Sequence, residues 1–203
     1  MKPELEELAR TASTCTLCRL SAGRTQVVFA SGNPDAELMF IGEGPGFHED
    51  KQGLPFVGAA GQLLNRLLGE IGLQREDVRV TNVVLCRPPG NRDPLPDEIE
   101  ACKPYLMEHI RLVDPRVIAT LGNFATRFIL GRPTAISRVR GQRHPFDGRV
   151  VIPTFHPAAI LRGGGDSSRQ MEAIRSDFRE MRTALEEARQ TVGAVIEEQL
   201  GLF

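Results

Sequence analysis

One stretch decides the fold: Gly42-Glu-Gly-Pro-Gly-Phe-His-Glu-Asp-Lys-Gln-Gly-Leu-Pro-Phe-Val-Gly58. The apolar run at residues 38–41 before it is typical of a buried strand. After it, apolar residues recur three and four positions apart from Ala60 to Ile71, which predicts a helix with one buried face. Strand, glycine-rich loop and helix together are how an open α/β sheet presents ligand-binding groups beyond its strand ends. The loop is therefore the first candidate for a functional site.

The alternation of strands and helices continues along the chain. Apolar runs predict further strands at 77–84, 116–121 and 150–155, and amphipathic patterns predict helices from residue 96, at 122–130 and at 171–185. This order predicts an α/β fold, a three-layer α/β/α arrangement with a central, mainly parallel four-stranded sheet and helices on both faces. Residues 138–151 are expected to form a hairpin whose arginines are either solvated or in contact with a DNA backbone.

Polar side chains gather at three of the predicted strand ends. They lie in the segments 43–56, 82–92 and 156–162. Because parallel strands present their carboxyl ends at one edge of a sheet, we expect these three segments to converge.

Length and composition limit the class of protein. The 203 residues suggest one domain, which we place at 1–190, followed by a C-terminal tail at 191–203. A net charge of -1 means that any site for a polyanion must be a local patch. No run approaches the roughly 18 apolar residues of a membrane helix, and the N-terminal residues lack the apolar core of a signal peptide. We expect a cytoplasmic, monomeric protein that does not enter a membrane.

The four cysteines indicate a metal centre. Cys15 and Cys18 are spaced so that both sulfurs can face one centre, and Cys86 and Cys102 can complete a set of four thiolates. Spacing alone leaves zinc and an iron–sulfur cluster equally open. Cys102 also fits a buried structural cysteine, because a free thiol packs as a small apolar group.

Several motifs resemble those of a known family. Between residues 15 and 178 the chain resembles the family 4, iron–sulfur-containing uracil-DNA glycosylases in the segments 15–18, 42–46, 49–50, 55–58, 81–82, 86–92 and 156–162 and at Cys102. The resemblance implies a monofunctional hydrolase that cleaves the N-glycosidic bond of uracil in single- or double-stranded DNA, leaves an abasic site and so initiates base excision repair. It also implies a [4Fe-4S] cluster on the four cysteines.

The resemblance assigns roles at the pocket. Glu43 would place the attacking water, and His156 would donate a hydrogen bond to the leaving uracil. The backbone at Gly44 and Gly46 could approach the substrate closely, and Gly42 and Gly44 would belong to the uracil-binding residues. The charge state of the histidine is left open. A turn-capping carboxylate and a structural cap are the alternative roles of these two side chains.

Three more side chains would read the base. Glu49 would exclude the methyl group of thymine, Phe56 would stack on the flipped base, and the amide of Asn82 would match the edge of uracil and reject that of cytosine. A solvated acid, a core phenylalanine and a turn former are the respective alternatives.

Further residues are expected to contact DNA and a partner protein. The resemblance implies that Leu161 and Arg162 enter the duplex where the base left and hold the neighbouring phosphates. Further phosphate contacts would come from Lys51, Arg87 and Arg92. The last residues, Gln199-Leu200-Gly-Leu202-Phe203, are similar to the short peptide with which replication proteins bind the sliding clamp, and residues 186–198 are polar enough to be a tether. The last turn of a docked helix is the alternative for this peptide.

Two other functions fit the same residues. One is a glycosylase of the same fold with a broader range of bases, and the other is a non-catalytic iron–sulfur module that binds DNA. Alkali treatment of a uracil-containing oligonucleotide after incubation separates an enzyme from a binding module.

Overall fold

A computed structural model describes the backbone of residues 2–199 and the side chains of residues 2–191. Its strands are β1 (Ser31–Gly32), β2 (Leu38–Gly42), β3 (Arg79–Asn82), β4 (Val117–Leu121), β5 (His144–Phe146) and β6 (Arg149–Thr154). Its α-helices are α1 (Pro3–Ser13), α2 (Phe47–Gln52), α3 (Ala59–Glu70), α4 (Pro96–Val113), α5 (Gly122–Leu130), α6 (Ile136–Val139), α7 (Pro157–Arg162) and α8 (Arg169–Gln199). Among the described residues, no helix is both long and apolar enough to cross a membrane.

The strands form one six-stranded sheet in the order β1-β3-β2-β4-β6-β5. The four inner strands are parallel, and the short edge strands β1 and β5 pair antiparallel to their neighbours. The predicted α/β class and the four parallel strands are confirmed, but the strand number is wrong, because the edges add two strands of two and three residues. Strands of that length carry too little apolar periodicity to be recognised in a sequence.

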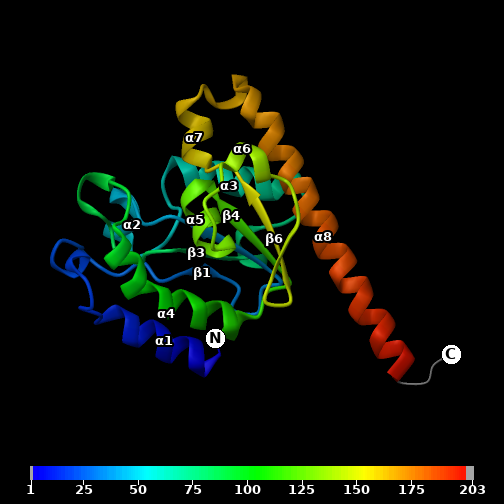
Figure 1. The fold of residues 1–203 in the computed structure, drawn as a ribbon, viewed down its shortest axis with the longest axis horizontal. Coiled ribbons are helices and arrows are strands. Elements are labelled where there is room, and N and C mark those ends of the chain that lie inside the picture. Colours follow the sequence, from blue (N-terminus) through cyan, green and yellow to red (C-terminus); the bar gives the residue numbers. More distant parts are fainter. Residues whose placement is uncertain (1, 200–203) are drawn as a thin grey trace.

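Helices cover both faces of the sheet (Figure 1). Leu38 and Phe40 of β2 face a core completed by α3, α7 and α8, whereas Met39 and Ile41 face a core completed by α1, α4 and α5. The alternation along one strand therefore serves two apolar layers, as expected for a parallel strand buried on both faces.

Two segments differ from the sequence expectation. The segment 138–151 is only in part a hairpin: its turn is Asp147–Gly148, as expected, but α6 occupies 136–139 before β5 begins. The polar segment 186–198, expected as a tether, is part of α8, which continues across residue 190 and extends beyond the sheet in Figure 1. Residues 200–203 of the expected clamp peptide lie outside the described residues, and of Gln199 only the backbone is described.

Most of the arginines that precede and follow the turn have acidic partners. Arg140 contacts the buried Asp177 of α8, Arg143 contacts Glu180 and Glu187, and Arg149 contacts Asp114. These ion pairs fasten the segment to the body of the domain. The contacts favour a structural role for these three side chains over contact with a DNA backbone.

Candidate active site

The glycine loop begins where β2 and β3 lie side by side. Gly42 pairs with Asn82 in the sheet register, so Glu43 leaves the sheet next to the end of β3. A Cβ on Gly42 would lie 2.4 Å from Oδ1 of Asn82 and 2.7 Å from Cζ of Phe56. Glycine is needed here because any larger side chain would displace the two groups expected to hold the base.

Phe56 is held in an unusual backbone conformation. Its φ of +57° lies in the left-handed region, which costs a non-glycine residue about 1 kcal/mol or more. Its ring stacks near that of His156, with 5.7 Å between centroids and 26° between planes. Gly61 of α3 approaches the Phe56 carbonyl so closely that an added Cβ would lie 1.7 Å from its oxygen. The strain is maintained by this packing, which aims the ring into the site.

Asn82 ends β3 with a side chain that is 1% exposed. Within the described part of the chain, its Oδ1 has no hydrogen-bond partner. A buried acceptor without a partner costs about 1–3 kcal/mol, which a ligand N–H would recover. This amide lines the same pocket as Glu43 and His156, so its free acceptor is within reach of a bound molecule.

His156 follows β6 and caps α7. Its Nδ1 accepts the backbone N–H of Ala158 at 3.2 Å, so in the neutral imidazole the proton is on Nε2. Burial, with a smaller effect of the charge on Arg162, lowers the pKa of His156 to about 4 against the opposing effect of Glu49. The cap expected as an alternative therefore coexists with a neutral hydrogen-bond donor.

Glu43 lies half-buried at the mouth of the loop. Burial raises the pKa of Glu43 to about 7, the neighbouring carboxylate of Asp93 adds to the rise, and the Arg162 guanidinium opposes it. A carboxyl group with a pKa near 7 can exchange protons with water at physiological pH, which is what a general base needs.

Glu49 is fixed by the backbone rather than solvated. Its Oε1 accepts the N–H groups of Val57 at 3.0 Å and Gly58 at 3.1 Å, at the start of α3. The carboxylate thereby joins α2 to the segment that carries Phe56. The adjacent Asp50 is buried and accepts the Thr25 N–H at 2.8 Å, which is a structural contact.

These side chains surround one pocket of about 610 Å³. Its lining includes all of the residues predicted for catalysis and base recognition except Gly42, which lies beneath Asn82 and Phe56: Glu43, Gly44, Glu49, Phe56, Asn82 and His156. The three strand-end segments converge as expected. Sequence reasoning missed Asp93, Asn123 and Phe155, which also line the pocket. Asp93 could have been found because it directly follows the second of these segments.

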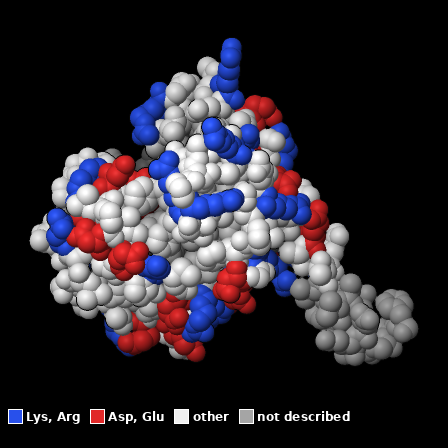
Figure 2. All heavy atoms as spheres, viewed as in Figure 1, with Lys and Arg blue, Asp and Glu red and all other residues white. Residues whose placement is uncertain are grey.

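The cations predicted to contact DNA have different surroundings. Arg162 lines the pocket, and Leu161 beside it on α7 is 39% exposed. Lys51 and Arg87 lie against the exposed ring of Phe47. In Figure 2, Lys and Arg side chains project over the region that Figure 1 labels α6 and α7, while acidic side chains are spread around the periphery of that face. The local basic patch required by the near-neutral net charge is therefore available.

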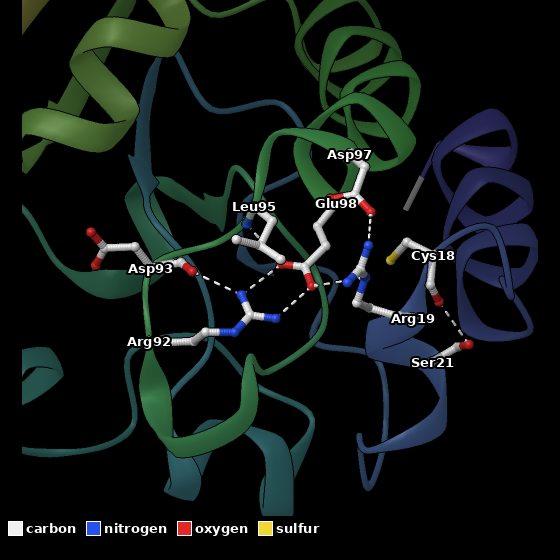
Figure 3. A network of polar contacts seen from close by, with 8 residues as sticks. All are labelled: Cys18, Arg19, Ser21, Arg92, Asp93, Leu95, Asp97 and Glu98. Carbon is white, nitrogen blue, oxygen red and sulfur yellow. Dashed lines mark hydrogen bonds and ion pairs between the residues drawn. The ribbon is translucent and has the colours of Figure 1, made fainter.

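Arg92 is half-buried at the pocket and is bound to a buried carboxylate. Figure 3 shows its guanidinium facing Glu98, whose side chain is 0% exposed, with N–O distances of 2.9 and 2.6 Å. Arg92 also donates to the Asp93 carbonyl at 2.8 Å, and Arg19 lies on the other side of Glu98 at 3.9 Å. Arg92 thus holds the Asp93 wall of the pocket, a role that the sequence did not indicate.

The four cysteines come from three separate parts of the chain. Burial raises the pKa of the Cys102 thiol to about 12, and Cys86, Cys18 and Cys15 are near enough to raise it further. Arg24 donates to Sγ of Cys86 at 3.3 Å, and a hydrogen bond with Cys15 is the main reason why the pKa of Tyr105 rises to about 12. The thiols therefore share one neighbourhood.

The donor set can be tested against the two metal centres that spacing left open. Within residues 2–191, no three His, Cys, Asp or Glu side chains surround the position of a single metal ion. Four cysteine thiols in one neighbourhood are a donor set that a [4Fe-4S] cluster and a zinc ion can both take, so the residues present fit the cluster.

Comparison with known proteins agrees with this site. The family described as "Uracil DNA glycosylase superfamily" matches residues 29–179. The chain is 46% identical to the type-4 uracil-DNA glycosylase of Thermotoga maritima, over 82% of this chain and 88% of that protein. It is 46% identical to the protein of that name from Sulfurisphaera tokodaii, over 77% of this chain and 76% of the other. For the one from Saccharolobus solfataricus, identity is 43% over 89% of this chain and 86% of the other.

Proposed function

The chain belongs to the type-4 members of the uracil-DNA glycosylase superfamily, and on that premise we propose that the pocket between β2, β3 and β6 excises uracil. The protein is a monofunctional uracil-DNA glycosylase, a hydrolase that cleaves the N-glycosidic bond of uracil in DNA and leaves an abasic site. Its substrate is uracil-containing DNA. What the residues of the pocket do in that reaction is our proposal.

The observation that carries the proposal is the Oδ1 of Asn82, which lies in the pocket and has no hydrogen-bond partner among residues 2–191. Uracil offers an N3–H donor beside an O4 acceptor, and the amide offers an acceptor beside a donor. Cytosine presents the opposite order on this edge. The N3–H of a bound uracil therefore donates to the buried Oδ1 of Asn82. The N3 of cytosine carries no proton and would leave this acceptor without a hydrogen bond.

His156 assists departure of the base. Negative charge grows on the uracil ring as the bond from C1′ to N1 breaks, and the Nε2–H of the imidazole can donate to O2. Because the low pKa keeps the ring neutral, it stabilises the anion by a hydrogen bond and transfers no proton to it. Phe56 stacks on the base and holds it against this donor.

Glu43 activates the attacking water. As the sugar acquires positive charge, the water oxygen bonds to C1′, its proton passes to the Glu43 carboxylate, and the electron pair of the broken bond leaves with uracil. Uracil then takes a proton from solvent. The raised pKa of Glu43 near 7 matches the group to this exchange.

Glu49 restricts the pocket to uracil. Its two backbone hydrogen bonds keep the carboxylate in place beside Phe56, where we propose that it occupies the space needed by the C5 methyl of thymine. A fixed carboxylate excludes a methyl group better than a mobile one, because moving it would break both bonds.

Several groups position the DNA. Lys51, Arg87 and Arg162 are proposed to hold phosphates, and the exposed Leu161 to enter the gap left by the extruded base. Arg92, occupied by Glu98, contributes by fixing the pocket wall more than by direct contact.

The four cysteines are proposed to hold a [4Fe-4S] cluster. The cluster would tie the N-terminal residues 15–18 to α4 and to the loop after β3, and no step of the reaction passes through it. Cys102→Ser should lose the visible absorbance of the purified protein and its bound iron, whereas retention of both would rule out Cys102 as a ligand.

The tail and the location of the protein are further proposals. Residues 199–203 have the side chains of a short linear peptide for a sliding clamp, and deleting them should abolish capture by the clamp while uracil excision persists. Unchanged capture would reject this role. A cytoplasmic location fits an enzyme whose substrate is genomic DNA.

The function is tested with oligonucleotides that differ at one base. Wild-type protein should produce alkali-sensitive sites with uracil and none with thymine or cytosine at the same position. Glu43→Gln should lose rate by more than about tenfold in single turnovers while binding is kept. Absence of product with wild-type protein and uracil would refute the assignment.

A further inference from the structure

Phe47 is an exposed aromatic side chain at the rim of the pocket. It begins α2 within the glycine loop, and 48% of its surface is exposed. Gly46 and Glu49, which lie on either side of it in the sequence, line the pocket, whereas Phe47 itself does not. Single exposed apolar residues are common, so the surroundings of the ring decide whether this one has a function.

Two cations lie against the Phe47 ring. The Arg87 guanidinium carbon is 5.1 Å and the Lys51 Nζ 5.8 Å from its centroid. Neither side chain forms an ion pair within residues 2–191, although most arginines of the domain do. Arg87 is also held by Asn91, a pocket residue, through a 2.7 Å hydrogen bond. The result is a half-open aromatic surface flanked by unneutralised positive charge.

We propose that Phe47 is the stacking surface for the nucleobase next to the extruded uracil in a single-stranded substrate, with Lys51 and Arg87 holding the adjoining phosphates. The proposal rests on the proposed function, because it needs uracil in the pocket. An aromatic face beside cations is the combination that binds single strands without sequence preference. In a duplex the neighbouring bases stay stacked on one another, so stacking on Phe47 should increase the affinity for single-stranded DNA more than the affinity for a duplex.

The test compares single-stranded and double-stranded oligonucleotides that carry 2′-fluoro-deoxyuridine, which slows cleavage. Phe47→Ala should weaken binding of the single strand by about tenfold, as expected for loss of one base–aromatic stack, and should weaken duplex binding by several-fold less. Phe47→Leu, which keeps apolar packing but has no aromatic face, should weaken binding of the single strand as Phe47→Ala does. Phe47→Trp, which keeps an aromatic face, should bind the single strand as tightly as the wild type. Met107→Ala, which removes another exposed apolar side chain on α4, is the matched control and should change neither.

A fluorescent 2-aminopurine placed on either side of the uracil analogue reports stacking directly. Its emission should be quenched by wild-type protein at one of the two positions and should recover in Phe47→Ala. Equal losses for single strand and duplex, or emission that is the same in wild type and variant at both positions, would overturn the proposal. Uracil excision by wild-type protein is measured in parallel, so that failure of the glycosylase assignment is distinguished from failure of the stacking surface.

Discussion

The close approach of Gly61 to Phe56 makes Gly61→Ala an informative substitution. Gly61 lies in α3, where alanine is favoured over glycine by about 1 kcal/mol. A Cβ at this position would lie 1.7 Å from the Phe56 carbonyl oxygen and 2.3 Å from its carbon, so the carbonyl must retreat by more than 1 Å to reach 3.0 Å. Overpacking of this kind costs about 1–3 kcal/mol, which exceeds the gain in helix propensity.

The catalytic effect should be larger than the loss of stability. A shift of about 1 Å in a group that positions the substrate costs about 100-fold in rate, so we expect kcat/KM for uracil excision to fall by about that factor. Gly69→Ala in the same helix is the matched control, because a Cβ there meets nothing within 4 Å. It should stabilise the protein by up to about 1 kcal/mol and leave excision unchanged. Urea unfolding and steady-state kinetics of both variants provide the assay, and Gly61→Ala behaving like Gly69→Ala would refute the account of Phe56.

Two further predictions concern the loop after β3. Because the pKa of Glu43 is raised to about 7 and the carboxylate form is the active one, the excision rate should rise with pH to a plateau above about 7. Asp93→Asn removes a neighbouring negative charge and should move this rise to lower pH. A pH–rate profile that is the same in Asp93→Asn and wild type would contradict the pairing of Asp93 with Glu43. Glu98→Gln should destabilise the protein by about 2 kcal/mol, since Arg92 loses a buried bidentate partner. The control Glu100→Gln, on the exposed face of α4, should cost less than about 0.5 kcal/mol. Equal unfolding midpoints of the two variants would argue against a role of Glu98 in holding the pocket wall.

The parts of the fold that could be predicted are those with local signals. The runs at β2, β3, β4 and β6 are rich in apolar residues and buried over most of their length, and the convergence of their carboxyl ends follows from parallel pairing. The site residues on those ends were therefore found together. The edge strand β1 has no recognisable signal because two residues cannot display a period, whereas β5 lies within the hairpin expected around Asp147–Gly148.

The details that tune the site could not be predicted because they depend on how side chains meet in the folded protein, which no sequence pattern indicates. Glu43 and Asp93 follow two different strands and meet only in the folded protein. Arg92 reaches Glu98 because the loop after β3 folds back onto the start of α4. The left-handed φ of Phe56 has no sequence signal, since phenylalanine is among the residues least suited to it. The neutral state of His156 likewise required the Ala158 hydrogen bond and the surrounding burial.

The central claim is that the pocket recognises the hydrogen-bonding edge of uracil through Asn82. The most direct measurement is kcat/KM for uracil and for cytosine at one position of the same oligonucleotide, in wild type and in Asn82→Asp. A site built on hydrogen bonds to its substrate rejects the mismatched partner strongly, so the wild-type ratio should be at least about 10⁴. If Asn82 reads this edge, Asn82→Asp should lower the ratio by at least about 100-fold, with measurable release of cytosine. A ratio unchanged by the substitution, with uracil still excised, would contradict it.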